Sequence, residues 1–209
     1  GLWLLDGMAA DGVLTTIDSE SELLGHARRN FAAAGLSSHR TRLIAGRALD
    51  VLPRMAARGY DMVVLDGDLN ETPQYLDHAV RILRPGGRYV IHELAMRPDS
   101  IAEEPATEIR RALARAINVN ARPLTVADWR RALEEVGLVV EETRTAPMAL
   151  LMPGRMIADE GVRGALRIMR NVARDKDLRE RVTTMARTFK KYDRHLCGVA
   201  IVARKPKES

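Results

Sequence analysis

The feature that most constrains the fold of this chain is an alternation, through its first half, of short apolar runs with longer amphipathic stretches. Such runs predict β-strands, and the stretches between them predict helices that cross between parallel strands. The strands are expected at residues 13–17, 41–45, 61–66 and 88–94. The third run has four consecutive apolar residues, which predicts a strand that is buried on both faces.

The helices between these strands are predicted from their end signals. Ser19 and Glu22 have the spacing of a capping box, which predicts that a helix begins there. Two further crossover helices are expected, over residues 48–58 and from Thr72 to a turn at residues 84–87.

After residue 94 the pattern changes, because helices now separate only two late strands. The helices are expected at residues 105–117, 125–137, 161–174 and 178–192, and the strands at residues 138–145 and 196–203. This order predicts an antiparallel edge on a parallel sheet. We therefore predict an α/β fold with a Rossmann-like, doubly wound, mainly parallel sheet, an antiparallel C-terminal strand and helical insertions. It is expected to form one domain over residues 1–209, with helical cap insertions at residues 94–123 and 147–194.

The positive charge of the chain is concentrated at its C-terminal end. Up to Asp159 there are 19 basic and 22 acidic residues, whereas from Glu160 onward there are 14 basic and 6 acidic ones. A basic segment of this kind can be a solvated helix face, or it can bind nucleic acid or an acidic membrane surface. Nucleic acid is the less favoured partner, because no aromatic residues are interleaved with the arginines for base stacking.

Composition excludes several other classes of protein. No run of about 18 apolar residues is present to cross a bilayer, and no signal peptide is recognisable. The single cysteine, Cys197, permits neither an intrachain disulfide nor a cysteine zinc site. These features predict a cytoplasmic protein with no membrane span.

Candidate site residues follow the predicted strands, because ligands of open parallel sheets gather at the carboxyl ends of the strands. Asp18 follows the first strand, where a carboxylate can accept both hydroxyl groups of a ribose; the alternative is that it only caps the next helix. Asp66, Gly67 and Asp68 follow the apolar third strand. Their carboxylates could hold an amine, a hydroxyl or a divalent cation, or the three residues could form an ordinary turn.

His92 and Glu93 end the fourth strand and are candidates for a general base. Because consecutive strand residues point to opposite faces, we expect at most one of them to face a ligand.

Taken together, four motifs resemble those of class I S-adenosylmethionine-dependent methyltransferases. They are Thr16-Ile17-Asp18, Ala45-Gly46-Arg47-Ala48, the run from Tyr60 to Asp66, and Leu83-Arg84-Pro85-Gly86-Gly87-Arg88. The resemblance implies that Asp18 binds the ribose of the cofactor and that Asp66, with Gly67, lies beside its methionine portion. It also implies that three residues lie along the adenine: Gly46, Arg47 and Ala48.

The two halves of the chain resemble different subgroups of this family. The first half is similar to small-molecule O-methyltransferases of the catechol type, which hold a metal with an Asp-Asn pair at the positions of His92 and Glu93. This departure counts against magnesium, and we assign no metal ligands. The second half is similar to metal-independent methyltransferase-domain proteins of actinobacteria. The family's first strand and glycine-rich loop would precede Gly1, so the sheet is expected to lack that strand and the chain to be N-terminally truncated.

The leading prediction is an enzyme that transfers methyl from S-adenosylmethionine to a small-molecule substrate, with His92 or Glu93 as the catalytic base and with an activity that the absent loop would impair. One alternative is a nicotinamide-dependent oxidoreductase, because Asp18 also suits the ribose of a dinucleotide. Another is a non-catalytic binder of RNA or a lipid surface that uses the basic segment. A homodimer is an arrangement that the sequence leaves open.

Overall fold

The computed structural model describes residues 1–66, 71–117, 123–148 and 153–207. The chain divides into two compact units, Gly1–Ala57 and Arg58–Ser209. Each unit has its own strands and helices, and the expectation of one domain over residues 1–209 stays a prediction. Within the described ranges, none of the helices combines the length and the apolar content needed to span a bilayer.

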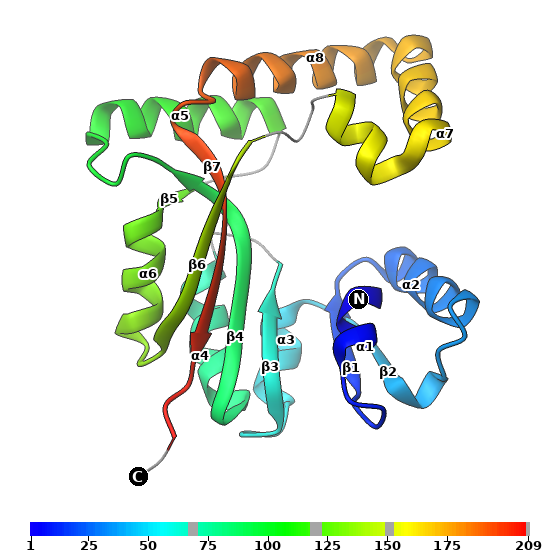
Figure 1. Cartoon of the computed structure of the whole chain (residues 1–209), viewed down its shortest axis with the longest axis vertical. Helices are drawn as coiled ribbons and strands as arrows, with labels where there is room; N and C mark the ends of the chain where they lie inside the picture. The colour runs from blue at the N-terminus through cyan, green and yellow to red at the C-terminus, as the bar shows by residue number, and fades with distance from the viewer. Residues whose placement is uncertain (67–70, 118–122, 149–152, 208–209) are drawn as a thin grey trace. The chain divides into compact units, whose positions relative to one another are not determined.

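The first unit contains two parallel strands, β1 (Leu14–Asp18) and β2 (Thr41–Ala45), labelled in Figure 1. β-branched residues are frequent in both, which favours extended backbone. Their register runs from Leu14 opposite Thr41 to Asp18 opposite Ala45. The helical elements of this unit, in which η denotes a 3-10 helix, are α1 (Leu2–Gly7), α2 (Ser21–Ala33), η1 (Ser38–Arg40), α3 (Ala48–Val51) and η2 (Leu52–Arg54).

Arg40 ties the start of the first unit to β2. Its Nε donates a hydrogen bond to the carbonyl of Gly12 at 3.1 Å, and its Nη2 donates to the carbonyls of Ala9 at 3.0 Å and Leu5 at 3.4 Å. These carbonyls lie at and beyond the end of α1, where helical carbonyls have no partner within the helix. One guanidinium therefore fixes the turn that leads into β1.

The second unit holds a mixed sheet with the strand order β3-β4-β7-β6, and β5 pairs with β4 as well. β3 runs parallel to β4, whereas β7 runs antiparallel to both β4 and β6. These pairings confirm an α/β fold with parallel strands and an antiparallel C-terminal strand. The predicted position of that strand is wrong, because β7 lies between β4 and β6 and not at the edge of the sheet. The elements are β3 (Tyr60–Leu65), α4 (Thr72–Ile82), β4 (Leu83–Met96), α5 (Glu103–Ile117), β5 (Leu124–Thr125), α6 (Val126–Glu135), β6 (Val139–Pro147), α7 (Pro153–Arg174), α8 (Lys176–Lys191) and β7 (Leu196–Arg204).

One face of this sheet is covered by α4 and α6. The strand residues on that face alternate along the chain with residues of the other face, as a pleated strand requires. The buried cluster comprises Leu76, Ala79, Leu83, Tyr89, Ile91, Ala95, Trp129, Leu133, Leu138, Cys197, Val199, Ile201 and Ala203. This cluster is the main core of the second unit.

A second buried cluster joins α5 and α8 to the ends of β4 and β7. Its members are Met96, Ala106, Ile109, Leu113, Tyr192 and Leu196. Figure 1 shows α5, α7 and α8 together at one end of the sheet of this unit. They lie within the ranges predicted as helical insertions.

The Arg-Pro-Gly-Gly segment, predicted as a turn before the strand, belongs to the start of β4, and main-chain and side-chain bonds join it to the end of the chain. The N–H of Gly86 donates to the carbonyl of Lys205, and the N–H of Lys205 donates to the carbonyl of Gly87, both at 2.9 Å. The Lys205 Nζ also donates to the carbonyls of Val80 at 2.7 Å and Leu83 at 2.9 Å, at the end of α4. A Cβ on Gly87 would lie 2.9 Å from the carbonyl oxygen of Arg84, so this position requires glycine.

Two helix predictions in the first unit need correction. α2 begins at Ser21 after an N-cap Glu20 that makes no side-chain capping bond, so the predicted capping box does not form. The helix predicted over residues 48–58 stops at Val51 and continues only as the short η2. Pro53 explains the change, because proline has no N–H to donate within an α-helix.

Two strand predictions in the second unit also need correction. β3 is not buried on both faces, because Met62 and Val64 are 46% and 44% exposed. β5 was not predicted, since two residues are too short to produce a periodic pattern. Its residues pair with Ala95 and Met96 of β4, and Thr125 also caps α6 by accepting a hydrogen bond from the N–H of Asp128 at 3.1 Å.

Candidate active site

The first unit brings Asp18 and Gly46 together at the carboxyl ends of its two strands. Asp18 lies opposite Ala45 in the register of β1 and β2. The N–H of Gly46 donates a hydrogen bond to the main-chain carbonyl of Asp18 at 2.9 Å. Two of the predicted cofactor-binding positions are therefore joined directly by the backbone.

The Asp18 carboxylate takes part in the turn before α2. Its Oδ1 accepts a hydrogen bond from the N–H of Glu20 at 2.8 Å. This contact orders the turn that leads into α2, and both alternatives for Asp18, ribose binding and helix capping, stay predictions. The bond uses one of the two oxygens, and a carboxylate has about four lone-pair sites, so the same side chain retains capacity for ribose hydroxyls.

The backbone after β2 needs glycine at residue 46. Gly46 has a φ of 148°, and a Cβ there would lie 3.3 Å from Cγ2 of Val51. Arg47 is the N-cap of the short α3, and Ala48 is its first residue. Residues 46–48 thus make the turn from β2 into α3, and the first N–H of this turn is bonded to the carbonyl of Asp18.

The second unit brings Asp66 close to the end of β4. Asp66 is exposed and directly follows β3, whose last residue, Leu65, pairs with Ile91. The next residues along β4 are His92 and Glu93. The proximity has an electrostatic effect, because the charge of Asp66 raises the pKa of Glu93.

Glu93 is a half-buried carboxyl group. It lies on the same face of β4 as the buried residues Tyr89, Ile91 and Ala95. Burial raises the pKa of Glu93 to about 7; a hydrogen bond from the backbone of Leu94 opposes the rise, and the charge of Asp66 adds to it. A carboxyl group with this pKa can accept or release a proton near neutral pH.

His92 lies on the opposite face of β4 and is exposed. It is paired with Ala200 of β7, whereas Glu93 is paired with Val199. The structure therefore places the two predicted catalytic residues on different faces of the sheet, as strand alternation requires.

The predicted residues form two separate sets. Within the first unit the structure joins Asp18 to residues 46–48, and within the second it brings Glu93 near Asp66. Gly67 and Asp68 lie outside the described residues. The assignments of individual residues to cofactor or substrate stay predictions.

Sequence reasoning missed Tyr89. Its ring is fully buried, and its hydroxyl lacks a hydrogen-bond partner among the described residues. Burial, with a smaller contribution from the charge of Glu93, raises the pKa of this phenol well above its usual range. The spacing of four residues between Tyr89 and Glu93 on one strand was the available signal, since it places both on one face.

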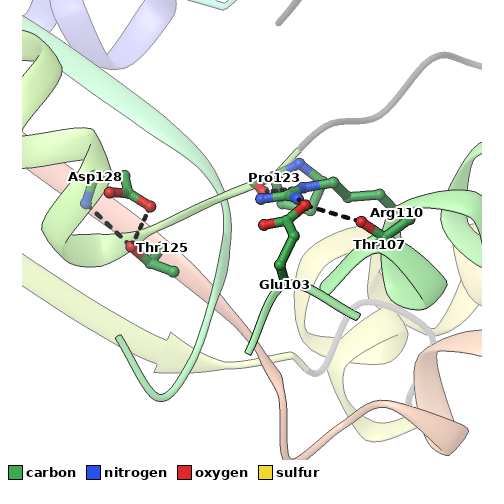
Figure 2. Close-up of polar contacts among 6 residues, drawn as sticks. All are labelled: Glu103, Thr107, Arg110, Pro123, Thr125 and Asp128. Atoms are coloured by element: carbon green, nitrogen blue, oxygen red, sulfur yellow. Dashed lines mark hydrogen bonds and ion pairs between the residues drawn. The ribbon is translucent and has the colours of Figure 1, made fainter. Parts of the chain in front are cut away.

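Sequence reasoning also missed a polar cluster on α5, shown in Figure 2. Glu103 accepts hydrogen bonds through Oε1 from Thr107 at 2.9 Å and from Nη1 of Arg110 at 3.0 Å. The Nε of Arg110 also donates to the carbonyl of Pro123 at 3.5 Å. The spacings of four and three residues place these side chains on one helix face, and they join α5 to the segment before β5.

A second polar cluster joins α5 to α8 beside a cavity of about 300 Å³. The Tyr192 hydroxyl donates to Oε1 of Glu108 at 2.6 Å, and the Lys191 Nζ donates to the same oxygen at 3.0 Å. The tyrosine bond, followed by the lysine, holds the pKa of Glu108 below its ordinary value. The lining residues are Glu108, Ala112, Arg115, Ala116, Thr184, Thr188, Lys191 and Tyr192, and none of them is a predicted site residue.

Metal ligation is not indicated by the side chains that the structure describes. Over those residues, no group of three or more His, Cys, Asp or Glu side chains lies close enough to hold an ion. The metal requirement therefore stays a prediction from sequence.

Comparison with known proteins finds methyltransferases, by sequence over part of the chain and by fold over nearly all of it. Residues 1–94 match a family described as a methyltransferase domain.

Two mycobacterial relatives carry the sequence likeness. The chain is 54% identical to a protein of Mycobacterium avium named as an O-methyltransferase. This match extends over 96 residues, which are 46% of this chain and 43% of that protein. Over 125 residues it is 46% identical to a protein of a Mycobacterium species (strain JLS) with the same name, covering 58% of this chain and 57% of that protein. The chain thus spans about half the length of the curated relatives it matches.

Solved structures of methyltransferases have a fold similar to that of this chain over nearly its whole length. A protein from Galdieria sulphuraria named as a sarcosine dimethylglycine methyltransferase has a TM-score of 0.73 at 14% identity, and the match covers 100% of this chain and 74% of that one. A methyltransferase from Thiobacillus denitrificans, solved with S-adenosyl-L-homocysteine, has a TM-score of 0.62 at 17% identity, covering 92% and 75% of the two chains. The comparisons support neither the oxidoreductase nor the non-catalytic binder.

Proposed function

We propose that this chain transfers a methyl group from S-adenosylmethionine to a small-molecule acceptor. The observation that carries the proposal is the match of residues 1–94 to a methyltransferase domain, which includes Asp18, Gly46, Asp66 and Glu93. The likeness to proteins named as O-methyltransferases favours a hydroxyl group as the acceptor.

The residues of the first unit suit the nucleoside part of this cofactor. Asp18 would accept hydrogen bonds from the ribose hydroxyls, since its carboxylate lies at the end of a strand and uses only Oδ1 for the turn. The turn at residues 46–48 would lie along the adenine. The direct bond between Gly46 and Asp18 supports one continuous surface for both groups.

The residues of the second unit suit the reacting end. When bound, S-adenosylmethionine supplies a methyl group that its sulfonium has already activated. Asp66, with Gly67, would lie beside the methionine portion. Glu93 is the base that we assign, because its pKa of about 7 lets it take the proton from an acceptor hydroxyl at neutral pH.

In this proposal the catalytic base is Glu93 and not His92. His92 is exposed on the other face of β4, so it does not share the environment of Glu93.

Positioning of the acceptor supplies the remaining rate enhancement, because the activated methyl group needs alignment more than a strong base. A cytoplasmic location and a homodimer stay predictions from sequence.

The proposal is tested by titrating S-adenosylmethionine and S-adenosylhomocysteine into the protein by calorimetry, with NAD as the comparison ligand and with and without magnesium. We expect saturable binding of both sulfur compounds and none of NAD. Asp18→Ala should weaken binding about tenfold to a hundredfold, the loss typical of a hydrogen bond to a charged group.

Asp18→Asn is the matched control for the fold, because its amide oxygen can still accept the hydrogen bond from Glu20 while the charge is lost. If Asp18→Asn binds as weakly as Asp18→Ala and unfolds like the unmodified protein, the carboxylate itself binds the ribose. Saturable binding of NAD alone would overturn the proposal in favour of an oxidoreductase.

A further inference from the structure

The second part of α7 carries an apolar stripe that faces solvent. Gly161 has a φ of 68° and a ψ of 168°, which interrupts the helix and sets off the segment from there to Arg174. In this segment Val162, Leu166 and Met169 are 63%, 60% and 60% exposed. Their spacings of four and three residues place them on one side of the helix. Large apolar side chains grouped in this way mark an interaction surface.

A row of four arginines lies directly beside this stripe. Arg163, Arg167 and Arg170 each follow one apolar residue of the stripe by one position, and Arg174 continues the row. One position corresponds to a rotation of about 100° around the helix axis. All four arginines are exposed, and the sequence from Gly161 to Arg174 contains no acidic residue.

The third side of the same helix faces the protein. Ala165 is buried at 3% exposure, and Ile168 and Val172 are half-buried. α7 packs against α8 within the second unit. The apolar stripe and the arginine row are therefore not needed for the packing of this helix, and together they form one outward surface, which we call the α7 surface.

We propose that the α7 surface docks the protein on the surface of an anionic lipid bilayer. Helices that lie in the membrane interface combine a face of apolar side chains with a neighbouring face of Lys and Arg. On the α7 surface, Val162, Leu166 and Met169 would enter the boundary between headgroups and acyl chains, and the four arginines would contact anionic headgroups. This surface adds a membrane contact to an enzyme and does not replace the enzymatic role.

The chemistry of the α7 surface favours an anionic bilayer over two other binding partners, a second copy of this chain and RNA. A second copy of this helix would bring four arginines against four arginines, so self-association is opposed by charge. RNA would pair with the arginines and leave the Val, Leu and Met side chains in water. An anionic bilayer is complementary to both rows at once.

The test is cosedimentation of the full chain with phosphatidylcholine vesicles that either contain or lack phosphatidylglycerol. We expect binding to the anionic vesicles only, weakened by added salt. Each arginine near an anionic surface contributes about fivefold in partitioning, so Arg167→Glu combined with Arg170→Glu should weaken binding by about 25-fold or more. The matched control is Arg28→Glu with Arg29→Glu, which makes the same change of charge on the exposed side of α2.

The apolar stripe is tested separately by Leu166→Gln with Met169→Gln, which retains helix-forming residues. We expect a loss of about tenfold for each substitution, from the apolar area that no longer leaves water. Unchanged vesicle binding by this variant would show that the apolar stripe does not enter the bilayer. No difference between the two vesicle types, or tighter binding to duplex RNA than to anionic vesicles, would overturn the proposal as a whole.

Discussion

The two faces of the sheet in the second unit differ in what their side chains do. The face under α4 and α6 buries Tyr89, Ile91 and Ile201 completely. On the opposite face Met62 and Val64 are about half-exposed, and Glu141 accepts hydrogen bonds from both Arg88 and Arg204. The covered face therefore supplies the stability of this unit, whereas the other face has side chains that can be changed at little cost to the fold.

The largest effect is expected at the centre of the covered face. Trp129 is 1% exposed, and its Nε1 donates to the carbonyl of Leu94 at 3.4 Å. Trp129→Ala should lower the free energy of unfolding by about 3–5 kcal/mol, because it leaves a cavity in the core. Urea unfolding followed by circular dichroism measures the loss. Val139→Ala, at a residue 48% exposed, is the control, and equal losses for the two variants would refute the distinction between the faces.

A smaller effect is expected where β7 meets the end of α4. Lys205→Met retains the length of the side chain but removes the donor to the carbonyls of Val80 and Leu83. The free energy of unfolding should fall by about 1–3 kcal/mol, since these carbonyls lose a charged donor. Lys207→Met, at an exposed residue, should be neutral in the same urea titration. A neutral Lys205→Met would mean that water replaces the ammonium group without cost.

Glu93 should make the stability of the protein depend on pH. Folding raises the pKa of Glu93 from 4.5 to about 7, so the folded state favours the uncharged carboxyl group. The stability of the protein should then fall as pH rises from about 4.5 through about 7, because the unfolded state releases the proton earlier.

Glu93→Gln should therefore raise the melting temperature relative to the unmodified protein at about pH 8 and leave it nearly unchanged at about pH 4. The control for a change of side chain at this point of the strand is Val90→Ala, at a residue of β4 that does not titrate. A melting-temperature difference for Glu93→Gln that is constant with pH would show that the carboxyl group is solvated.

The smallest effect is expected on β3. Val64→Ser should change the free energy of unfolding by no more than about 0.5 kcal/mol, because the side chain is 44% exposed. Its neighbour Val63 packs against the main core, so Val63→Ser should cost about 1–3 kcal/mol. Comparable losses in chemical denaturation would show that both faces of β3 are covered in solution.

Most elements of the fold could be predicted from sequence, because their signals are local. The strand at residues 41–45 has the predicted bounds, and α6 has as its N-cap Thr125, the first residue of the helix predicted over residues 125–137. The predictions were wrong where a single residue determines the end of a helix, or where the packing around a strand determines its exposure. Pro53 ends α3 early, and the exposure of Met62 depends on what lies across the sheet rather than on the apolar run itself.

The assignment of a site to these residues stays a prediction, but some of its geometry could be predicted from sequence. Asp18 ends β1 and Asp66 follows β3, whereas His92 and Glu93 lie inside β4, which continues to Met96 beyond the predicted end at residue 94. Strand alternation correctly predicted that His92 and Glu93 lie on opposite faces. The raised pKa of Glu93 was not accessible, since it arises from burial beside side chains that are distant in sequence. The hydrogen bond from the N–H of Glu20 to Oδ1 of Asp18 also depends on the geometry of the turn and could not be predicted from sequence.

The hydrogen bond from Gly46 to the carbonyl of Asp18 has a consequence for how this chain can diverge. It joins the two strand ends through main chain only, so the side chains along β1 and β2 can be exchanged while the separation of the two positions is preserved. The same bond makes insertions intolerable: one residue added within either strand would turn the Asp18 carboxylate to the other face of the ribbon or move it away from Gly46. Variation by substitution is therefore permitted in these strands, and variation by length is not.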